Sequence, residues 1–434
     1  MDKILPRDPS FAGRDEPHSV AEAVSSFYER HPYPPPVDDL DRYRERWADP
    51  QRRRAAVFLC WPAEAYREDR SILVAGCGTS QTAKYALRWP RARVTGIDVS
   101  PSSLRETDTL KMKYGLDNLE LRELPVERAS ELGGTFESVV CTGVLHHLGD
   151  PVAGLRALRE VLEPSGALHL MVYAPFGRVG VYLIQDYCRR LGAGSTTQEI
   201  RDLASSLSAL PQNHPLAPLL RSSPDFRTEA GLADALLHPQ DRPFSVPELF
   251  DFIEEGGLRF GRWIRQAPYL PHCGALAASP HHTLLTRLPL REQYAAVELF
   301  RGTMVRHSAV VFRDDQPGEA QPIDFAGEAW RDYVPLREPG TVCVEDRLPP
   351  GAAAVLINPA HSYQDIYLPI DSSDKRMFDA IDGKATIGMI AREHGDSASA
   401  RSLFERLWCF DQVVFDASRT GVRLRGDTAR EIVR

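Results

Sequence analysis

The run Ile72-Leu73-Val74-Ala75-Gly76-Cys77-Gly78-Thr79-Ser80 decides the fold class of this chain. Four consecutive apolar residues predict a buried strand, and the glycines that follow predict a turn into a helix. A glycine in such a turn lets the backbone approach a ligand closely, because no Cβ intervenes. The run therefore indicates a ligand-binding strand–turn–helix unit, a device that many nucleotide-binding folds share.

Apolar runs alternate with amphipathic helical stretches from Ser71 to Met171. Such alternation predicts βαβ units and a doubly wound parallel α/β sheet, with ligands at the carboxyl ends of its strands. Ser100-Pro101 and Asp150-Pro151 each place a capping residue before a proline at the first helical position. The expected strands are 72–75, 93–97, 119–122, 138–142 and 167–172, and the expected helices are 80–88, 101–114 and 151–162.

A carboxylate, Asp98, ends the second expected strand, about 20 residues after the glycine turn. At this position it can accept hydrogen bonds from both hydroxyls of a ribose. The dinucleotide fingerprint GxGxxG would need Gly or Ala at position 81, but the chain has Gln81. A ligand that has a ribose but no pyrophosphate does not need this third glycine, and S-adenosylmethionine is such a ligand.

These motifs, followed by Phe136–Val140, Thr142–Leu148 and Gly166–Leu170, resemble in order those of class I S-adenosylmethionine-dependent methyltransferases. The resemblance implies S-adenosylmethionine as the cofactor, with its methionine in the glycine turn and its ribose on Asp98. That family often has an Asp after the third strand. This chain reads Arg122–Val126 there, so the contact to the adenine amino group is expected from the backbone. The cofactor residues expected by resemblance are Ala75, Gly76, Cys77, Gly78, Asp98, Val99, Leu124, Pro125, Thr142 and Gly143.

Methyl transfer from a sulfonium is an in-line displacement that depends mainly on holding the acceptor in near-attack geometry. A base is needed only if the acceptor carries a proton. His146 and His147 follow the fourth expected strand, and Tyr173 follows the apolar part of the fifth. We take these three as the candidate catalytic residues. The alternative is that one imidazole packs structurally, that the other hydrogen-bonds a backbone carbonyl, and that Tyr173 forms part of the pocket wall.

Two further segments supply candidate substrate contacts. The aromatic and proline-rich segment Phe27–Pro34 resembles the capping segment of a bacterial subgroup of these enzymes, and suits a lid that excludes water. The alternative is that its aromatic residues merely pack the first helix onto the sheet. The resemblance to the subgroup continues around His238 and Arg242. The candidate substrate residues are Tyr28, Tyr33, His238 and Arg242.

We expect no metal site. His281 and His282 are adjacent and have no partner at a ligand spacing, which makes them a poor ligand set.

The sequence predicts five regions. These are an N-terminal tail and lid helix (1–50), a Rossmann-like cofactor core (51–178), a helical substrate-covering region with late strands (179–313), a linker (314–349) and a C-terminal winged-helix-like α+β domain (350–434). The phrase Asp382–Ile387 resembles small peptide-binding domains of ribosomal-peptide modification pathways, which would present an edge strand to a peptide. A dimerising or pocket-covering role is the alternative. A DNA-binding winged helix is a third option, weakened by the lack of a dense basic cluster.

Composition narrows the function class. The formal net charge of −8 argues against a nucleic-acid-binding protein, which usually carries a basic face. Seven cysteines stand singly without a CxxC pair, which is typical of reduced thiols in the cytoplasm. The sequence has no run of about 20 mostly apolar residues, so it predicts no membrane span. The polar N-terminus does not resemble a signal peptide.

Three functions remain open from the sequence. The first is an S-adenosylmethionine-dependent methyltransferase of a small molecule, acting at oxygen, nitrogen or carbon. The second is a methyltransferase of a peptide or protein that the C-terminal domain recruits. The third is a non-catalytic binding protein that kept the fold. The oligomeric state is also open, with a homodimer among the alternatives.

Overall fold

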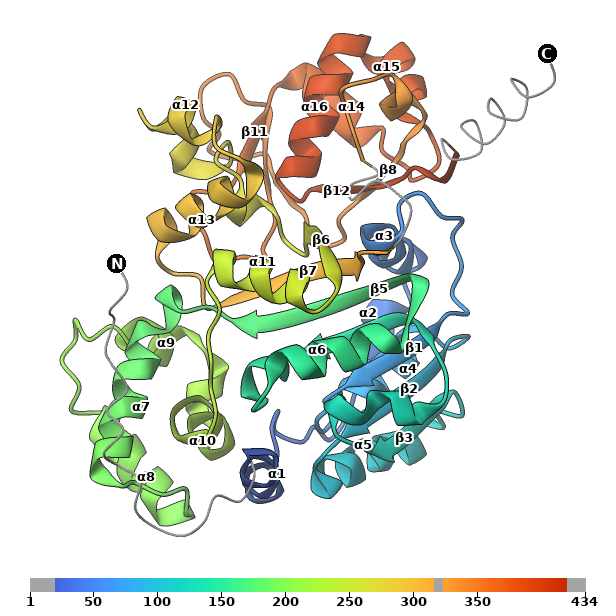
Figure 1. Ribbon diagram of the computed structural model, residues 1–434. Coiled ribbons are helices and arrows are strands. Elements are labelled where there is room, and N and C mark those ends of the chain that lie inside the picture. Colours follow the sequence, from blue (N-terminus) through green and yellow to red (C-terminus); the bar gives the residue numbers. More distant parts are fainter. Residues whose placement is uncertain (1–19, 316–322, 420–434) are drawn as a thin grey trace.

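The computed structural model describes residues 20–315 and 323–419. Its centre is a seven-stranded sheet with the strand order β3-β2-β1-β4-β5-β7-β6 (Figure 1). The first five strands pair in parallel, and β7 runs antiparallel to both β5 and β6. The strands are β1 Ser71–Ala75, β2 Arg93–Asp98, β3 Leu119–Glu123, β4 Phe136–Thr142, β5 Leu162–Tyr173, β6 Leu258–Trp263 and β7 Arg306–Arg313. The predicted doubly wound sheet is confirmed, because its strand order reverses between β1 and β4.

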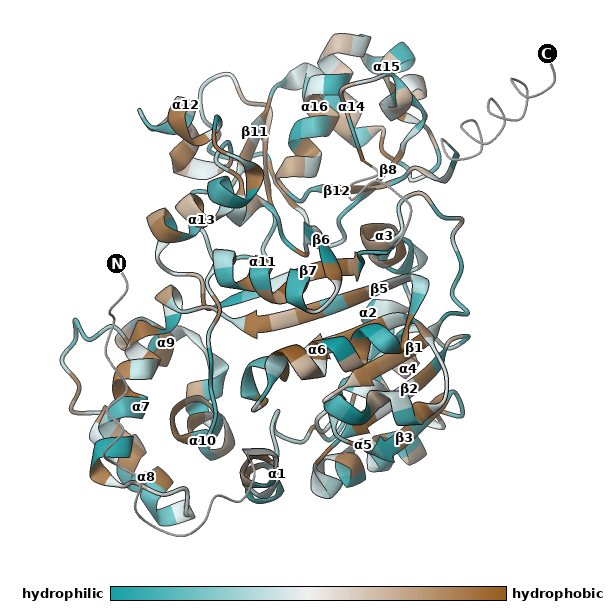
Figure 2. Ribbon diagram, viewed as in Figure 1, coloured by the Kyte–Doolittle hydropathy of each residue, from teal (hydrophilic) through white to brown (hydrophobic). Residues whose placement is uncertain are grey.

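Strand β1 is buried along its whole length because helices cover both faces of the sheet. Ile72 and Val74 pack in one apolar cluster with α3 and α4, whereas Leu73 and Ala75 pack in another with α6. Accordingly, Figure 2 shows hydrophobic residues, in brown, along the strands of the sheet. The helices of this part are α3 Pro50–Cys60, α4 Gln81–Arg88, α5 Pro101–Tyr114 and α6 Pro151–Glu160.

The predicted helix caps are present. The Ser100 side chain accepts a hydrogen bond from the backbone of Ser103, and Asp150 accepts one from Ala153. Upstream, α1 spans Val20–Arg30 and α2 spans Asp41–Trp47. Helices α2 and α3 are separate because the Asp49 side chain caps α3, which starts with Pro50.

A helical region follows the sheet strand β5. It contains α7 Val179–Leu191, α8 Thr197–Leu207, α9 Ala217–Ser222, α10 Glu229–Leu237, α11 Val246–Glu255, α12 His282–Leu285 and α13 Leu290–Arg301. Short 3-10 helices span Val126–Leu132, Leu145–His147, Phe176–Arg178, Pro224–Arg227, Ala267–Tyr269, Gly274–Ala278 and Ala329–Asp332. In Figure 1, α7, α8 and α10 lie beside α1 at the end of the sheet towards which β5 points.

The segment predicted as a linker is instead part of the C-terminal region. Within its described residues, Trp330, Tyr333 and Leu336 are buried, and β8 Val334–Arg337 pairs with β12 Val413–Asp416. The prediction was wrong because a few apolar residues among many polar ones are enough to anchor a short strand. The region also holds β9 Val342–Val344, β10 Ala354–Ile357, β11 Leu368–Ile370, α14 Ser372–Asp379, α15 Ile387–His394 and α16 Ser397–Cys409.

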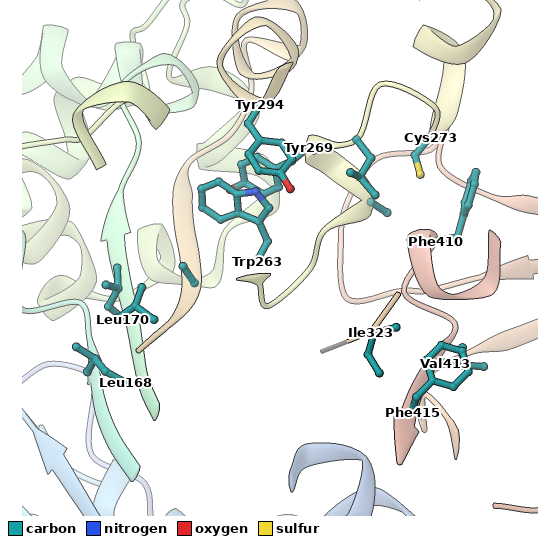
Figure 3. Close-up of a cluster of buried hydrophobic side chains, with 14 of the residues drawn as sticks. Leu168, Leu170, Trp263, Tyr269, Cys273, Tyr294, Ile323, Phe410, Val413 and Phe415 are labelled. Atoms are coloured by element: carbon teal, nitrogen blue, oxygen red, sulfur yellow. The ribbon is translucent and has the colours of Figure 1, made fainter. Parts of the chain in front are cut away.

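The C-terminal region is α+β, and its core is continuous with that of the sheet. Figure 3 shows Trp263 and Tyr269 between the sheet residues and the C-terminal residues of this cluster, and their rings stack at 3.9 Å. The buried Asp411 accepts a hydrogen bond of 2.9 Å from the backbone of Ala267 and lies 3.7 Å from the Arg262 guanidinium. The two parts are thus packed as one body. The winged-helix character of the C-terminal region remains a prediction. Among the described residues, no helix combines the length and the apolar character that crossing a bilayer requires.

Candidate active site

The glycine turn after β1 is held against the end of β2. The backbone N–H groups of Gly76 and Cys77 both donate to the Ile97 carbonyl, at 2.8 and 3.0 Å. Gly76 has a φ of 68°, and a Cβ there would lie 2.2 Å from Cγ2 of Val144. At Gly78, with a φ of 55°, a Cβ would lie 3.0 Å from Cδ of Pro34. Glycine is therefore required at both positions, by conformation and by space.

The Asp98 carboxylate is fixed by backbone amides at the same edge of the sheet. Its Oδ2 accepts from Gly78 N at 2.8 Å and its Oδ1 accepts from Ser100 N at 2.9 Å. Burial raises the pKa of Asp98, and these hydrogen bonds oppose the rise. Each oxygen keeps a further lone pair, so the carboxylate fits two ribose hydroxyls.

A cavity of about 520 Å³ opens between the glycine turn, Asp98 and the helical region. Gln81, at the start of α4, spans two strand ends by donating to the Thr142 hydroxyl at 2.8 Å. Ala75 does not border the cavity because it is fully buried in β1, and Pro125 does not border it either. The expected cofactor residues that line the cavity are Gly76, Cys77, Gly78, Asp98, Val99, Leu124, Thr142 and Gly143.

The N-terminal segment covers this cavity. Tyr28 and Tyr33 line it, and the Thr79 hydroxyl donates to the Pro34 carbonyl at 2.8 Å. On the far side, the Tyr28 hydroxyl donates to Oδ1 of Asp234 at 3.1 Å. The segment is thus tied both to the glycine turn and to α10, which is the arrangement expected of a lid.

Two of the three predicted catalytic residues, His147 and Tyr173, line the cavity. His147 is buried, with Nδ1 2.6 Å from the Gln240 carbonyl. Because a carbonyl can only accept, Nδ1 carries a proton, and in the neutral tautomer Nε2 is the nitrogen with the lone pair. The Arg178 guanidinium lies 3.6 Å from the centre of the Tyr173 ring and 3.1 Å from Asp241.

The other predicted residues lie elsewhere. His146 is fully buried and does not line the cavity. Its ring centre lies 4.0 Å from that of Tyr173, and burial lowers its pKa. His238 stacks on His147 at 3.8 Å without reaching the cavity surface, and Arg242 is exposed, over the ring of Phe244. We therefore withdraw His146 as a catalytic residue, and His238 and Arg242 as direct substrate contacts, because packing directs all three away from the cavity.

Two overlapping groups could in principle hold a metal ion. The first group is His146, His147 and Asp241, and the second is His147, Asp234 and His238. Within each group, the possible ligand atoms lie within 4.8 Å of one another. In each group, one possible metal ligand is already engaged in another interaction. The Asp241 carboxylate already pairs with the Arg178 cation, and Nδ1 of His238 accepts from Gln240 N at 3.1 Å. That hydrogen bond places the His238 proton on Nε2, the atom that would bind metal.

The cavity-wall residues that sequence reasoning missed include Arg178, Asp225 and Asp234. Asp234 is almost fully buried, at 3% exposure, and burial raises its pKa. Asp225 stands in an exposed 3-10 helix at the rim of the cavity. No local motif marks these residues. The one usable signal was Asp234 itself, because the residues of α10 between Glu229 and Asp234 and after Asp234 carry no charge.

Comparison with known proteins agrees with this geometry. Residues 73–168 match the family model of a methyltransferase domain. An uncharacterized protein of Synechococcus is 34% identical over 255 residues, which are 56% of this chain and 60% of that protein. The ubiquinone biosynthesis O-methyltransferase of Paracidovorax citrulli is 32% identical over 100 residues, 23% of this chain and 42% of the relative. The chain thus spans about half the length of the curated relatives it matches.

The fold has a solved counterpart in PKMT2 from Rickettsia typhi in complex with AdoHcy. The two structures superpose with a TM-score of 0.58 at 14% sequence identity, over 87% of this chain and 74% of that one. At this identity the likeness is one of fold. The strand order, the glycine turn, Asp98 and the matched family model together identify the segment around residues 73–168 as a class I methyltransferase domain with S-adenosylmethionine as its cofactor.

Proposed function

We propose that this chain transfers the methyl group of S-adenosylmethionine to a small-molecule acceptor. One observation carries the proposal. The residues that fit the cofactor and the side chains Tyr28, Tyr33, His147 and Tyr173 line a single cavity. The acceptor would sit between these side chains, over the open side of the glycine turn.

The cofactor supplies an electrophilic methyl group, so the task of the protein is to orient the acceptor and to exclude water. Tyr28 and Tyr33 enter the cavity from the lid, and Tyr173 enters from the end of β5. Burial raises the pKa of Tyr173, so its hydroxyl stays protonated and can donate a hydrogen bond to the acceptor.

His147 is our candidate for proton removal. Its Nδ1 proton is held by the Gln240 carbonyl, and the residue lines the cavity, so Nε2 would be the nitrogen that accepts a proton. A neutral imidazole held in this way can accept a proton from a hydroxyl or an ammonium group. His146 has no such access and is assigned a packing role.

The size and enclosure of the cavity favour a small acceptor. About 520 Å³ is within the range of small-molecule sites, and the cofactor must occupy a large part of it. The segment 382–387, which resembles peptide-binding domains, is hydrogen-bonded to α3. Arg54 donates to the Gly383 carbonyl at 2.7 Å, and Gln51 to that of Asp382 at 3.4 Å. We therefore assign this turn to docking of the C-terminal region on α3.

We also propose a reducing compartment, the cytoplasm. All seven cysteines lie within the described ranges and all are free thiols.

The test follows a labelled methyl group from S-adenosylmethionine into a cell extract separated into small metabolites and macromolecules. We expect label among the small metabolites with the full chain, and none with Asp98→Ala. Label confined to the macromolecules would replace the proposal with the peptide or protein alternative. Failure of the unmodified chain to bind S-adenosylhomocysteine would favour a non-catalytic binding protein.

A further inference from the structure

The segments between β5 and β7 contribute two carboxylates and one cation to the cavity wall. Asp234 and Asp225 both line it. The nearest cation, Arg178, is already neutralised by Asp241 at 3.1 Å, and both of these side chains are nearly buried. A ring nitrogen of His147 lies within 4.8 Å of an Asp234 carboxylate oxygen. The other cationic residues of the cavity wall are Lys84 and Arg88 on α4, and Arg306 at the start of β7.

The Asp234 carboxylate is only partly satisfied by the protein. Its Oδ1 accepts from Tyr28, whereas its Oδ2 accepts no hydrogen bond from any part of the chain that the structure describes. A buried carboxylate is costly unless a cation or hydrogen-bond donors compensate it. Since Asp234 borders the cavity, a ligand can supply that compensation.

Aromatic rings surround the same space. Tyr28, Tyr33 and Tyr173 all line the cavity, as does Asp225. Burial raises the pKa of all three, which keeps the phenols neutral. The face of a neutral aromatic ring attracts cations, and most strongly where water is excluded.

We infer that the acceptor is an amine that enters the cavity as its ammonium form, held by Asp234 and the tyrosine rings with Asp225 at the entrance. The inference rests on the proposed function and specifies its substrate class. A neutral alcohol would leave Asp234 without a counter-charge, and an anionic acceptor would be repelled by both carboxylates.

The steps balance. The ammonium group gives one proton to Nε2 of His147, which frees the nitrogen lone pair. That lone pair forms the new C–N bond while the methyl carbon–sulfur bond breaks and its electron pair stays on sulfur. The methylated product leaves as an ammonium ion, and His147 returns its proton to solvent.

The test is a binding measurement on the full chain loaded with S-adenosylhomocysteine. Benzylamine, benzyl alcohol and benzoate serve as probes, because they share a ring and differ in the charge of the head group. We expect the protonated amine to bind at least tenfold more tightly than the alcohol, and benzoate to bind more weakly still. Equal affinity for amine and alcohol, or a preference for benzoate, overturns the inference.

Two variants locate the effect. Asp234→Asn should reduce the preference for the amine to about twofold or less, whereas Asp234→Glu should retain part of it. Asp186→Asn is the matched control, because Asp186 pairs with Arg189 and Arg190 of its own helix, α7, away from the cavity lining. If Asp234→Asn weakens S-adenosylhomocysteine and leaves the preference for the amine intact, the carboxylate serves the cofactor and the inference fails. If the wild-type chain binds no S-adenosylhomocysteine, the proposed function itself fails.

Discussion

The hydroxyl of Tyr28 donates a hydrogen bond of 3.1 Å to Oδ1 of Asp234, which lies 206 residues further along the chain. This contact joins the lid helix α1 to α10 directly over the cavity. Each residue lies on a different segment that covers the site. One hydrogen bond therefore connects the segment over the site with the acidic group in its wall.

Removing the Tyr28 hydroxyl should impair the acceptor step more than cofactor binding. Tyr28→Phe leaves Asp234 without its hydrogen-bond donor, a loss of about 1–3 kcal/mol for a buried charged group. We expect methyl transfer to fall about tenfold or more, with S-adenosylhomocysteine affinity changed less than about twofold. Steady-state kinetics and calorimetry measure the two effects. Tyr187→Phe, at an exposed position of α7, should change neither.

Removing the Asp98 carboxylate should abolish tight cofactor binding. Asp98→Ala loses two charge-assisted hydrogen bonds to the ribose, which predicts a loss of about 100-fold or more in affinity. Titration calorimetry with S-adenosylhomocysteine measures this. An affinity within about threefold of the wild type would show that the ribose is bound elsewhere. Asp117→Ala, in the loop before β3, is the surface control.

A side chain at position 76 should also block the cofactor. In Gly76→Val, the Cβ would overlap Val144 at 2.2 Å, in a backbone conformation that disfavours side chains. We expect loss of binding together with lower stability. Gly115→Ala separates the two causes, since Gly115 has a φ of 60° but nothing within 4 Å of a Cβ. Gly115→Ala should lower the free energy of unfolding by about 1 kcal/mol, measured by thermal denaturation, and leave cofactor binding intact. Normal cofactor affinity in Gly76→Val would contradict the placement of the turn.

Chelators should leave methyl transfer unchanged. The carboxylate of one candidate metal group is engaged by Arg178, and a ligand nitrogen of the other carries its proton. Activity and elemental analysis before and after dialysis against EDTA measure this. Loss of activity that zinc or manganese restores would show that these hydrogen bonds rearrange around a metal.

The C-terminal region should depend on Asp411 for docking. Asp411→Ala leaves the buried Arg262 without its carboxylate and the Ala267 N–H without an acceptor, so we expect a loss of about 3–5 kcal/mol in unfolding free energy. Urea denaturation measures the loss. Glu229→Ala breaks the exposed pair with Arg201 and should cost about 1 kcal/mol or less. Equal effects of the two variants would argue against a structural role for the buried pair.

The sequence alone determined the cofactor half of the site. The strand β1, the glycine turn, Asp98 and the caps Ser100 and Asp150 all lie where the sequence predicts them. These features depend on neighbours only a few residues away, through strand patterning, backbone conformation and side-chain capping. Local sequence therefore carries enough information to place them.

Only the tertiary structure decided the acceptor half. His146 and His147 are adjacent in sequence, yet only His147 reaches the cavity, because the 3-10 helix turns its neighbour inward against Tyr173. Asp234 becomes a cavity residue only when α10 packs beside the lid helix. Likewise, β8 becomes a strand only by pairing with β12. Such positions are set by contacts between segments far apart in the chain, and no local pattern records them.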